Sequence, residues 1–233
     1  MALGHGNVVL DASMISGVEA SSPGSRAILL SAALFDFLFL AMAAFLGDIL
    51  GSFGDPDDVF VEHYGSSSKR AGDIIGSLLL VLLGGSFVWH IYLVRRAFGG
   101  GPVSPGLDVP VLTSSAFAIA LLLAAAALST VPLGREIGDL FDERKPRLEG
   151  SETAVLGHFG YVLLFGVGGI TSAACVLFTS VSLRRTLAPG WLVVAGFVAA
   201  AMLPLSAAAF MPFLALPVWV ALSASAAWLA SKT

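Results

Sequence analysis

The stretch TLAPGWLVVAGFVAAAMLPLSAAAFMPFLALPVWVALSASAAWLAS, residues 186–231, contains no charged side chain. An α-helix rises about 1.5 Å per residue, so roughly 20 apolar residues cross the ~30 Å hydrocarbon layer of a bilayer. The stretch is therefore long enough to cross twice, with the turn placed at its helix-breaking prolines, Pro204 and Pro212. A single re-entrant segment is the alternative interpretation of the same residues.

Apolar runs also dominate the rest of the chain. Hydrophobic residues make up 57% and charged residues 12% of the sequence, and the charged share is about half the ~25% of soluble domains. Such a chain cannot cover a water-facing surface with polar groups. We therefore predict an all-α membrane protein with six transmembrane helices arranged in three hairpins. The predicted spans cover about residues 27–47, 74–94, 111–133, 153–183, 187–205 and 210–230.

The domain organisation follows from the same pattern. Residues 1–25 are mixed in character and rich in Gly and Ser, so we expect a loosely ordered N-terminal segment. Residues 26–233 then form one transmembrane domain. Cys175 is the single cysteine of the sequence and lies inside an apolar run. An intrachain disulfide is impossible because Cys175 has no second cysteine to pair with.

The basic residues predict the orientation in the membrane. In the six-helix topology, one set of basic residues flanks the helix ends on a single side, whereas those on the other side are diluted among acids in longer loops. Short basic loops carry most of the positive-inside signal. We therefore expect both termini in the cytoplasm and the acidic loops outside. The flanking set is Arg26, Arg95, Arg96, Arg184, Arg185 and Lys232.

Asp36 and His90 are the candidate polar pair inside the membrane. By helical rise, Asp36 lies roughly 13 Å and His90 roughly 7 Å from the cytoplasmic side, on spans that are predicted to be antiparallel neighbours. An Asp near the bilayer centre costs about 2.5–3.5 kcal/mol and is expected to face the bundle interior with a partner. The pair predicts either a proton relay or substrate site, or a protonated acid that only holds helices together.

His158 and Tyr161 are candidates on the external side, because they lie one turn apart on one helix face about 7 Å inside that interface. Depth argues against a haem held between His90 and His158. The two residues are separated by about 15 Å along the membrane normal, whereas iron–nitrogen bonds are roughly 2 Å long.

The first external loop contains DPDDVFVEHYG, residues 55–65. Its acids and histidine can in principle bind a divalent cation, because oxygen-rich loops suit hard ions and a histidine suits zinc. The spacing matches no calcium loop, and solvated acids outside a membrane are the ordinary interpretation, so we expect no metal. The candidate ligands are Asp57, Asp58, Glu62 and His63.

Several motifs are missing from the sequence. It has no Walker motif, no GxSxG, no HExxH and no CxxC, and no basic, aromatic-rich surface for nucleic acid. We therefore expect no cofactor and no nucleic-acid partner.

Three stretches carry a family resemblance: SSSKRAGDIIGSLLLVLLGGSFVW (residues 66–89), APGWL (residues 188–192) and VWVALSASAAWLA (residues 218–230). Together they resemble uncharacterised six-helix integral membrane proteins of actinobacteria. The resemblance implies a bacterial plasma-membrane location and brings no established function.

Three functions fit these observations. The first is a plasma-membrane accessory subunit that binds membrane lipid, other membrane subunits or further copies of itself, because few polar residues converge. The second is a small proton-coupled transporter that uses Asp36 and His90. The third is an intramembrane enzyme acting on a lipid or isoprenoid with Asp36 as general acid, so that the sequence alone leaves enzymatic activity undecided.

Overall fold

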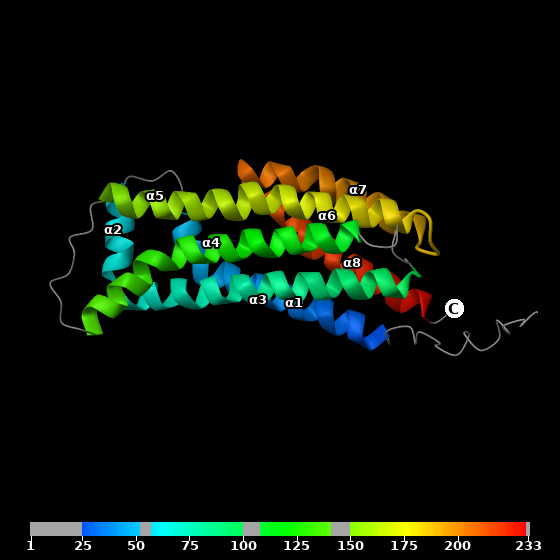
Figure 1. Ribbon diagram of the computed structural model, residues 1–233, viewed down its shortest axis with the longest axis horizontal. Coiled ribbons are helices and arrows are strands. Elements are labelled where there is room, and N and C mark those ends of the chain that lie inside the picture. The colour runs from blue at the N-terminus through cyan, green and yellow to red at the C-terminus, as the bar shows by residue number, and fades with distance from the viewer. Residues whose placement is uncertain (1–24, 52–56, 100–107, 141–149, 232–233) are drawn as a thin grey trace, which may run out of the picture.

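The structure, a computed structural model, describes residues 25–51, 57–99, 108–140 and 150–231 (Figure 1). All regular secondary structure in these ranges is helical, and they contain no β-strand. The N-terminal segment that was predicted to be loosely ordered lies outside the described ranges except for its last residue.

Six helical segments of the described chain are long and apolar enough to cross a membrane, which agrees with the prediction. Two of them come from the uncharged stretch that ends the chain. In chain order the segments are α1 (Ser25–Gly51); α3 (Ser67–Ala97); α4 (Val109–Leu140); α5 (Gly150–Tyr161) with the π-helix η2 (Val162–Val167) and α6 (Gly168–Leu183); α7 (Gly190–Met202) with the 3₁₀-helix η3 (Leu203–Ala207); and the 3₁₀-helix η4 (Met211–Leu214) with α8 (Ala215–Ala230).

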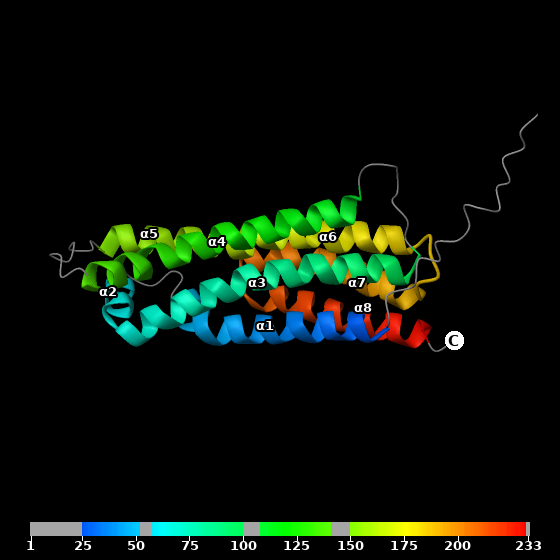
Figure 2. The same cartoon turned by 60° about the horizontal axis from the view of Figure 1, so that its bottom comes forward.

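The spanning segments form a closed ring in chain order. α1 packs on α3, α3 on α4, α4 on α6, α6 on α7 and α7 on α8, and α8 returns to α1. The start of α1 and the end of α8 therefore lie at the same end of the bundle (Figures 1 and 2). We call this the basic end, because Arg95 and Arg184 also lie there.

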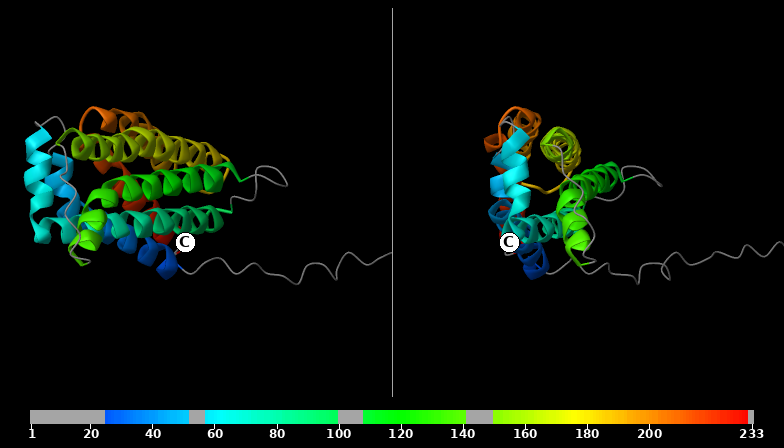
Figure 3. Two further views of the ribbon diagram at one scale, coloured as in Figure 1. Left: turned by 60° about the vertical axis from the view of Figure 1, so that its left-hand side comes forward. Right: turned by 90° about the vertical axis from the view of Figure 1, so that its left-hand side faces the viewer.

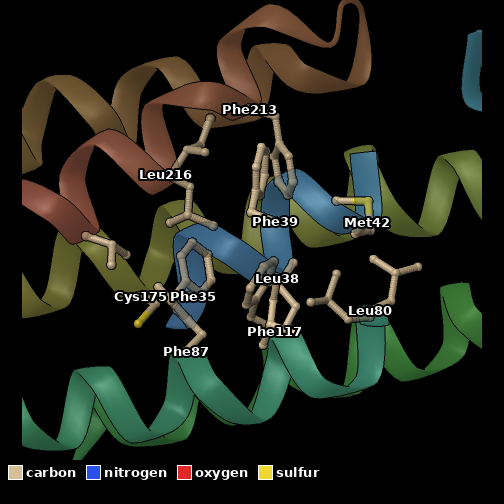
Figure 4. Packing of buried hydrophobic residues seen from close by; sticks show 14 of the residues in the cluster. Phe35, Leu38, Phe39, Met42, Leu80, Phe87, Phe117, Cys175, Phe213 and Leu216 are labelled. Carbon is tan, nitrogen blue, oxygen red and sulfur yellow. The ribbon is translucent and has the colours of Figure 1, made fainter. Parts of the chain in front are cut away.

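Aromatic side chains pack together with aliphatic ones in the interior of the bundle (Figure 4). Ring centroids lie 5.0 Å apart for Phe87 and Phe117, 5.5 Å for Phe35 and Phe87, and 5.8 Å for Phe39 and Phe213. Such edge-to-face and tilted pairs add to the gain from burying the rings. We call these residues, with Phe165 against Phe213, the aromatic core.

The other end of the bundle is covered by α2 (Asp57–Gly65), which lies across the ends of the long helices (Figures 1 and 3). The 31 residues of α3 rise about 46 Å, which exceeds the ~30 Å hydrocarbon layer. A helix of this length either tilts in the bilayer or extends past it. At this end α2 packs on α3 and α5. We call this the cap end.

Two details of the helices differ from expectation. α3 begins at Ser67 rather than near residue 74, because Arg70 and Asp73 do not lie in a solvated loop. They belong to the helix, where both are buried and paired with residues of neighbouring helices. The fourth apolar run also contains the π-helix, beside which the Ser206 hydroxyl lies 2.7 Å from the carbonyl oxygen of Phe165. π-Helices are rare and commonly appear as single-turn bulges inside α-helices.

Candidate functional site

His90 is the centre of a polar cluster in the membrane-spanning part of the bundle. The residue is fully buried on α3. Its Nδ1 lies 2.9 Å from Oγ of Ser31 on α1, and its Nε2 lies 2.8 Å from Oγ of Ser223 on α8. This His90 triad, Ser31–His90–Ser223, therefore joins three helices around one imidazole.

Proton counting shows that the His90 triad is complete without a ligand. Ser31 Oγ lies 2.8 Å from the carbonyl oxygen of Ile28, and Ser223 Oγ lies 2.8 Å from that of Val220. A neutral imidazole has one N–H and one bare nitrogen. One serine therefore accepts from the N–H and donates to its own helix, while the other serine donates to the bare nitrogen. Both ring nitrogens are occupied in either tautomer.

Asp36 does not join this triad. It follows Ser31 by five residues, which is about 140° around the helix axis, so the two side chains leave α1 in different directions. Its Oδ1 is buried and has no hydrogen-bond partner within the described chain. No hydrogen bond joins Asp36 to His90 in the described chain, because both ring nitrogens of His90 face serines.

The exposed neighbours of Asp36 place it at the edge of the buried face of α1. Phe35 and Phe39, which come before and after Asp36 on α1, belong to the buried face. Phe37 and Leu40 are 66% and 67% exposed. Asp36 itself is half-buried. The acid therefore lies where the protein interior meets the exposed apolar surface of α1.

A second polar cluster lies at the cap end. His63 Nε2 on α2 lies 2.8 Å from Oδ2 of Asp73 on α3, and both residues are buried. Arg70 donates from Nε to Glu136 on α4 at 2.7 Å and from Nη1 to the carbonyl oxygen of Tyr64 at 3.0 Å. Burial, with a contribution from the charge of Asp73, raises the pKa of Tyr64 above its usual range. We call these five residues the cap cluster.

The cap cluster includes His63, one of the four residues considered as candidate metal ligands, in a different role. His63 is buried against Asp73, whereas Glu62 beside it is exposed, so the two point away from each other. The side chains of Asp57 and Asp58 lie outside those described. Among the described residues, no group of three His, Cys, Asp or Glu side chains is arranged to hold a metal ion.

Sequence reasoning missed Arg70, Asp73 and Glu136, because their charges suggested solvated loops. One signal was present. Arg70, Asp73 and Ser77 are spaced by three and four residues, and this spacing places them on one face of a helix that leads directly into an apolar run.

His158 and Tyr161 lie on α5, and both are half-buried. The His158 ring meets the ring of Phe60 edge-on at 5.3 Å, and Tyr161 packs on Phe165 at 4.7 Å. A Cβ added to Gly157 would lie 2.7 Å from the Phe60 ring, so the glycine lets α2 approach α5. His90 cannot offer a ring nitrogen to a shared ligand with His158, because both of its nitrogens are occupied.

Arg70 is expected to hold α2 in place. Replacing it with alanine removes a buried donor from the Tyr64 carbonyl and from Glu136, and hydrogen bonds to charged groups contribute about 1.5–3 kcal/mol. We expect faster amide hydrogen exchange in α2 with little change in α7 and α8. Glu136→Gln is the control, with a smaller effect, because Glu136 is 40% exposed. Unchanged exchange of α2 in Arg70→Ala would show that this contact does not fix the cap.

Comparison with known proteins gives no relative. No protein-family model, characterised protein or solved structure shows significant similarity to this chain. The functional assignment therefore rests on the site itself.

Proposed function

We propose that this protein is a multi-pass accessory subunit of a bacterial plasma membrane, which binds a partner membrane protein along α1. The observation that supports this most is Asp36, an intramembrane acid whose buried Oδ1 has no hydrogen-bond partner in the described chain. Acids within transmembrane segments are costly and almost always pair with another group. A donor from a partner helix can supply that group, because Asp36 lies beside the exposed residues Phe37 and Leu40.

The two polar clusters favour this function over catalysis or transport. The His90 triad satisfies its own hydrogen bonds, and the cap cluster pairs His63 with Asp73 and Arg70 with Glu136. A proton-coupled carrier using Asp36 and His90 needs the two groups to exchange a proton, and they are not hydrogen-bonded to each other. Both residues are also close in sequence to the aromatic core, since Phe35 precedes Asp36, Phe87 lies one turn before His90, and the two rings pack on each other.

The orientation that we propose places the basic end in the cytoplasm and α2 outside, as the positive-inside rule favours. Arg96, Arg184 and Arg185 are exposed at the basic end. Arg95 contributes less to this signal than its position suggests, because it is buried and pairs with Asp108 at 3.2 Å. Asp108 also caps the start of α4 by accepting from the backbone N–H of Val111 at 3.4 Å.

The test combines photo-crosslinking with substitution of Asp36. A photoreactive residue is placed at one of two exposed positions of α1. Leu40 lies one turn after Asp36 on the same side of the helix, whereas Leu30 lies about 120° away from Asp36 around the helix axis. In native membranes we expect one discrete heterologous adduct at Leu40 and none of that size at Leu30. Asp36→Leu is expected to reduce the adduct at least tenfold, and Asp36→Asn less, because an amide still accepts a hydrogen bond.

Two results would argue against this function. An adduct of equal yield with Asp36→Leu, in protein that still folds, would show that the acid does not bind the partner. A pH-dependent solute flux in proteoliposomes that Asp36→Asn abolishes would instead identify a transporter.

A further inference from the structure

Ser77 differs from every other buried serine of the described chain. Each of the others places its hydroxyl within hydrogen-bonding distance of a carbonyl oxygen one turn earlier in its own helix. Ser77 Oγ is buried and has no partner at all, not even that carbonyl. The serines that bond to their own helix are Ser31, Ser86, Ser114, Ser172, Ser180, Ser206 and Ser223.

Asp73 has an unpartnered atom on the same face of α3. Its Oδ2 pairs with His63, but its Oδ1 is buried without a hydrogen bond. Asp73 and Ser77 are 1% and 3% exposed. Residues four apart on a helix have Cβ atoms about 5–6 Å apart, so the two unpartnered oxygen atoms belong to neighbouring side chains on this face.

Leaving either atom without a hydrogen bond is costly. A buried acceptor or donor that has lost its partner costs about 1–3 kcal/mol, and more when it is charged. Ser77 could avoid that cost by bonding to its own helix, since each of the seven other serines lies within reach of such a carbonyl, but its hydroxyl has no such contact. An additional molecule that bonds to both oxygens explains the two exceptions together.

We propose that an ordered water molecule is bound between Oδ1 of Asp73 and Oγ of Ser77. Water donates to the carboxylate oxygen and accepts from the serine hydroxyl, which gives both unpartnered atoms a hydrogen bond. A metal ion fits less well, because Arg70 lies one turn before Asp73 and His63 already donates to its other oxygen. The described residues also place no third acid or histidine in a metal-binding group here.

The bound water extends the cap cluster into the spanning part of α3. Hydrogen bonds then run from His63 on α2 through Asp73 and the water to Ser77. The site therefore couples the seating of α2 to the third turn of α3, and it is independent of partner binding at Asp36.

The test is an experimental structure of the full chain at a resolution that shows ordered water. We expect a density peak within hydrogen-bonding distance of both atoms. The peak is expected to be lost in Ser77→Val, because a methyl group then replaces the hydroxyl that holds the water. Ser77→Val is expected to lower the midpoint of thermal unfolding by about 2–4 °C. Ser86→Ala, a buried serine satisfied by its own helix, is the control and is expected to lower it less.

Two results would overturn the proposal. The first is the absence of a peak, with the Ser77 hydroxyl bonded to its own helix. The second is a sodium effect on thermal unfolding: a midpoint of the wild-type chain that is higher in sodium chloride than in choline chloride, with no such difference in Ser77→Val. The molecule between the two oxygens would then be a cation. If Ser77→Val does not fold, the wild-type density and its sodium dependence still decide between water, cation and neither.

Discussion

Replacing Gly169 with alanine is expected to destabilise the bundle by about 1–3 kcal/mol, the usual cost of overpacking a well-packed interior. The added Cβ would collide with Oγ of Ser206 and lie 2.8 Å from the carbonyl oxygen of Leu203. The Leu203 oxygen belongs to the backbone and cannot rotate away. η3 must therefore move from α6, which also strains the contact of Ser206 with Phe165. Denaturant titration in mixed micelles, followed by circular dichroism, measures the loss.

Gly85→Ala is the matched control, because a Cβ at this position has nothing within 4 Å. The same chemical change is expected to leave stability unchanged or raise it by up to about 1 kcal/mol, since alanine favours helix more than glycine does. An equal loss of stability in the two variants would contradict the close approach of α6 and η3.

Replacing His90 with alanine is expected to have the largest effect, about 3–4 kcal/mol. The change removes a fully buried ring and leaves a cavity in the middle of three helices, for which large-to-small substitutions typically cost 3–5 kcal/mol. The loss of the imidazole adds little cost at Ser31 and Ser223, because each hydroxyl can still donate a hydrogen bond to a carbonyl of its own helix. The same unfolding titration applies. His90→Phe, which keeps an aromatic ring in place but is slightly larger and loses the hydrogen bonds, is expected to cost less, about 1–2 kcal/mol.

The adjacent residue gives the control for position. Trp89→Ala removes a larger ring one residue earlier on α3, but Trp89 is 43% exposed, so we expect a smaller loss than for His90→Ala. If the two variants lose equal stability, the His90 triad does not hold α1, α3 and α8 together. If His90→Ala is as stable as the wild type, the histidine has a role other than packing.

The spanning segments were predictable because the bilayer imposes a simple condition on composition. A run of about 20 uncharged residues has few other uses, so residues 186–231 indicated two crossings without any knowledge of their neighbours. The limits of α3 were harder to predict. Charges mark a loop only if they are solvated, and Arg70 and Asp73 are paired across helices with Glu136 and His63.

The candidate site shows the same division between local and non-local information. Depth follows from counting residues, and it suggested that Asp36 and His90 lie at related levels. Rotation about a helix axis follows from packing, and here it turns Ser31 rather than Asp36 toward His90. Ser223, the other partner of the imidazole, comes from the last helix of the chain. No spacing in the sequence connects it to α3.

Single-cysteine labelling tests the claim on which the account depends most, that six helices cross the membrane with α2 outside. Three spanning segments separate Glu62 on α2 from Arg185 at the basic end, and both residues are exposed. In chains with Cys175 replaced by serine, an impermeant maleimide added to intact spheroplasts is expected to label Glu62→Cys at once and Arg185→Cys only after permeabilisation. Labelling of both positions from outside would contradict the six-helix topology, and the reverse pattern would contradict the proposed orientation.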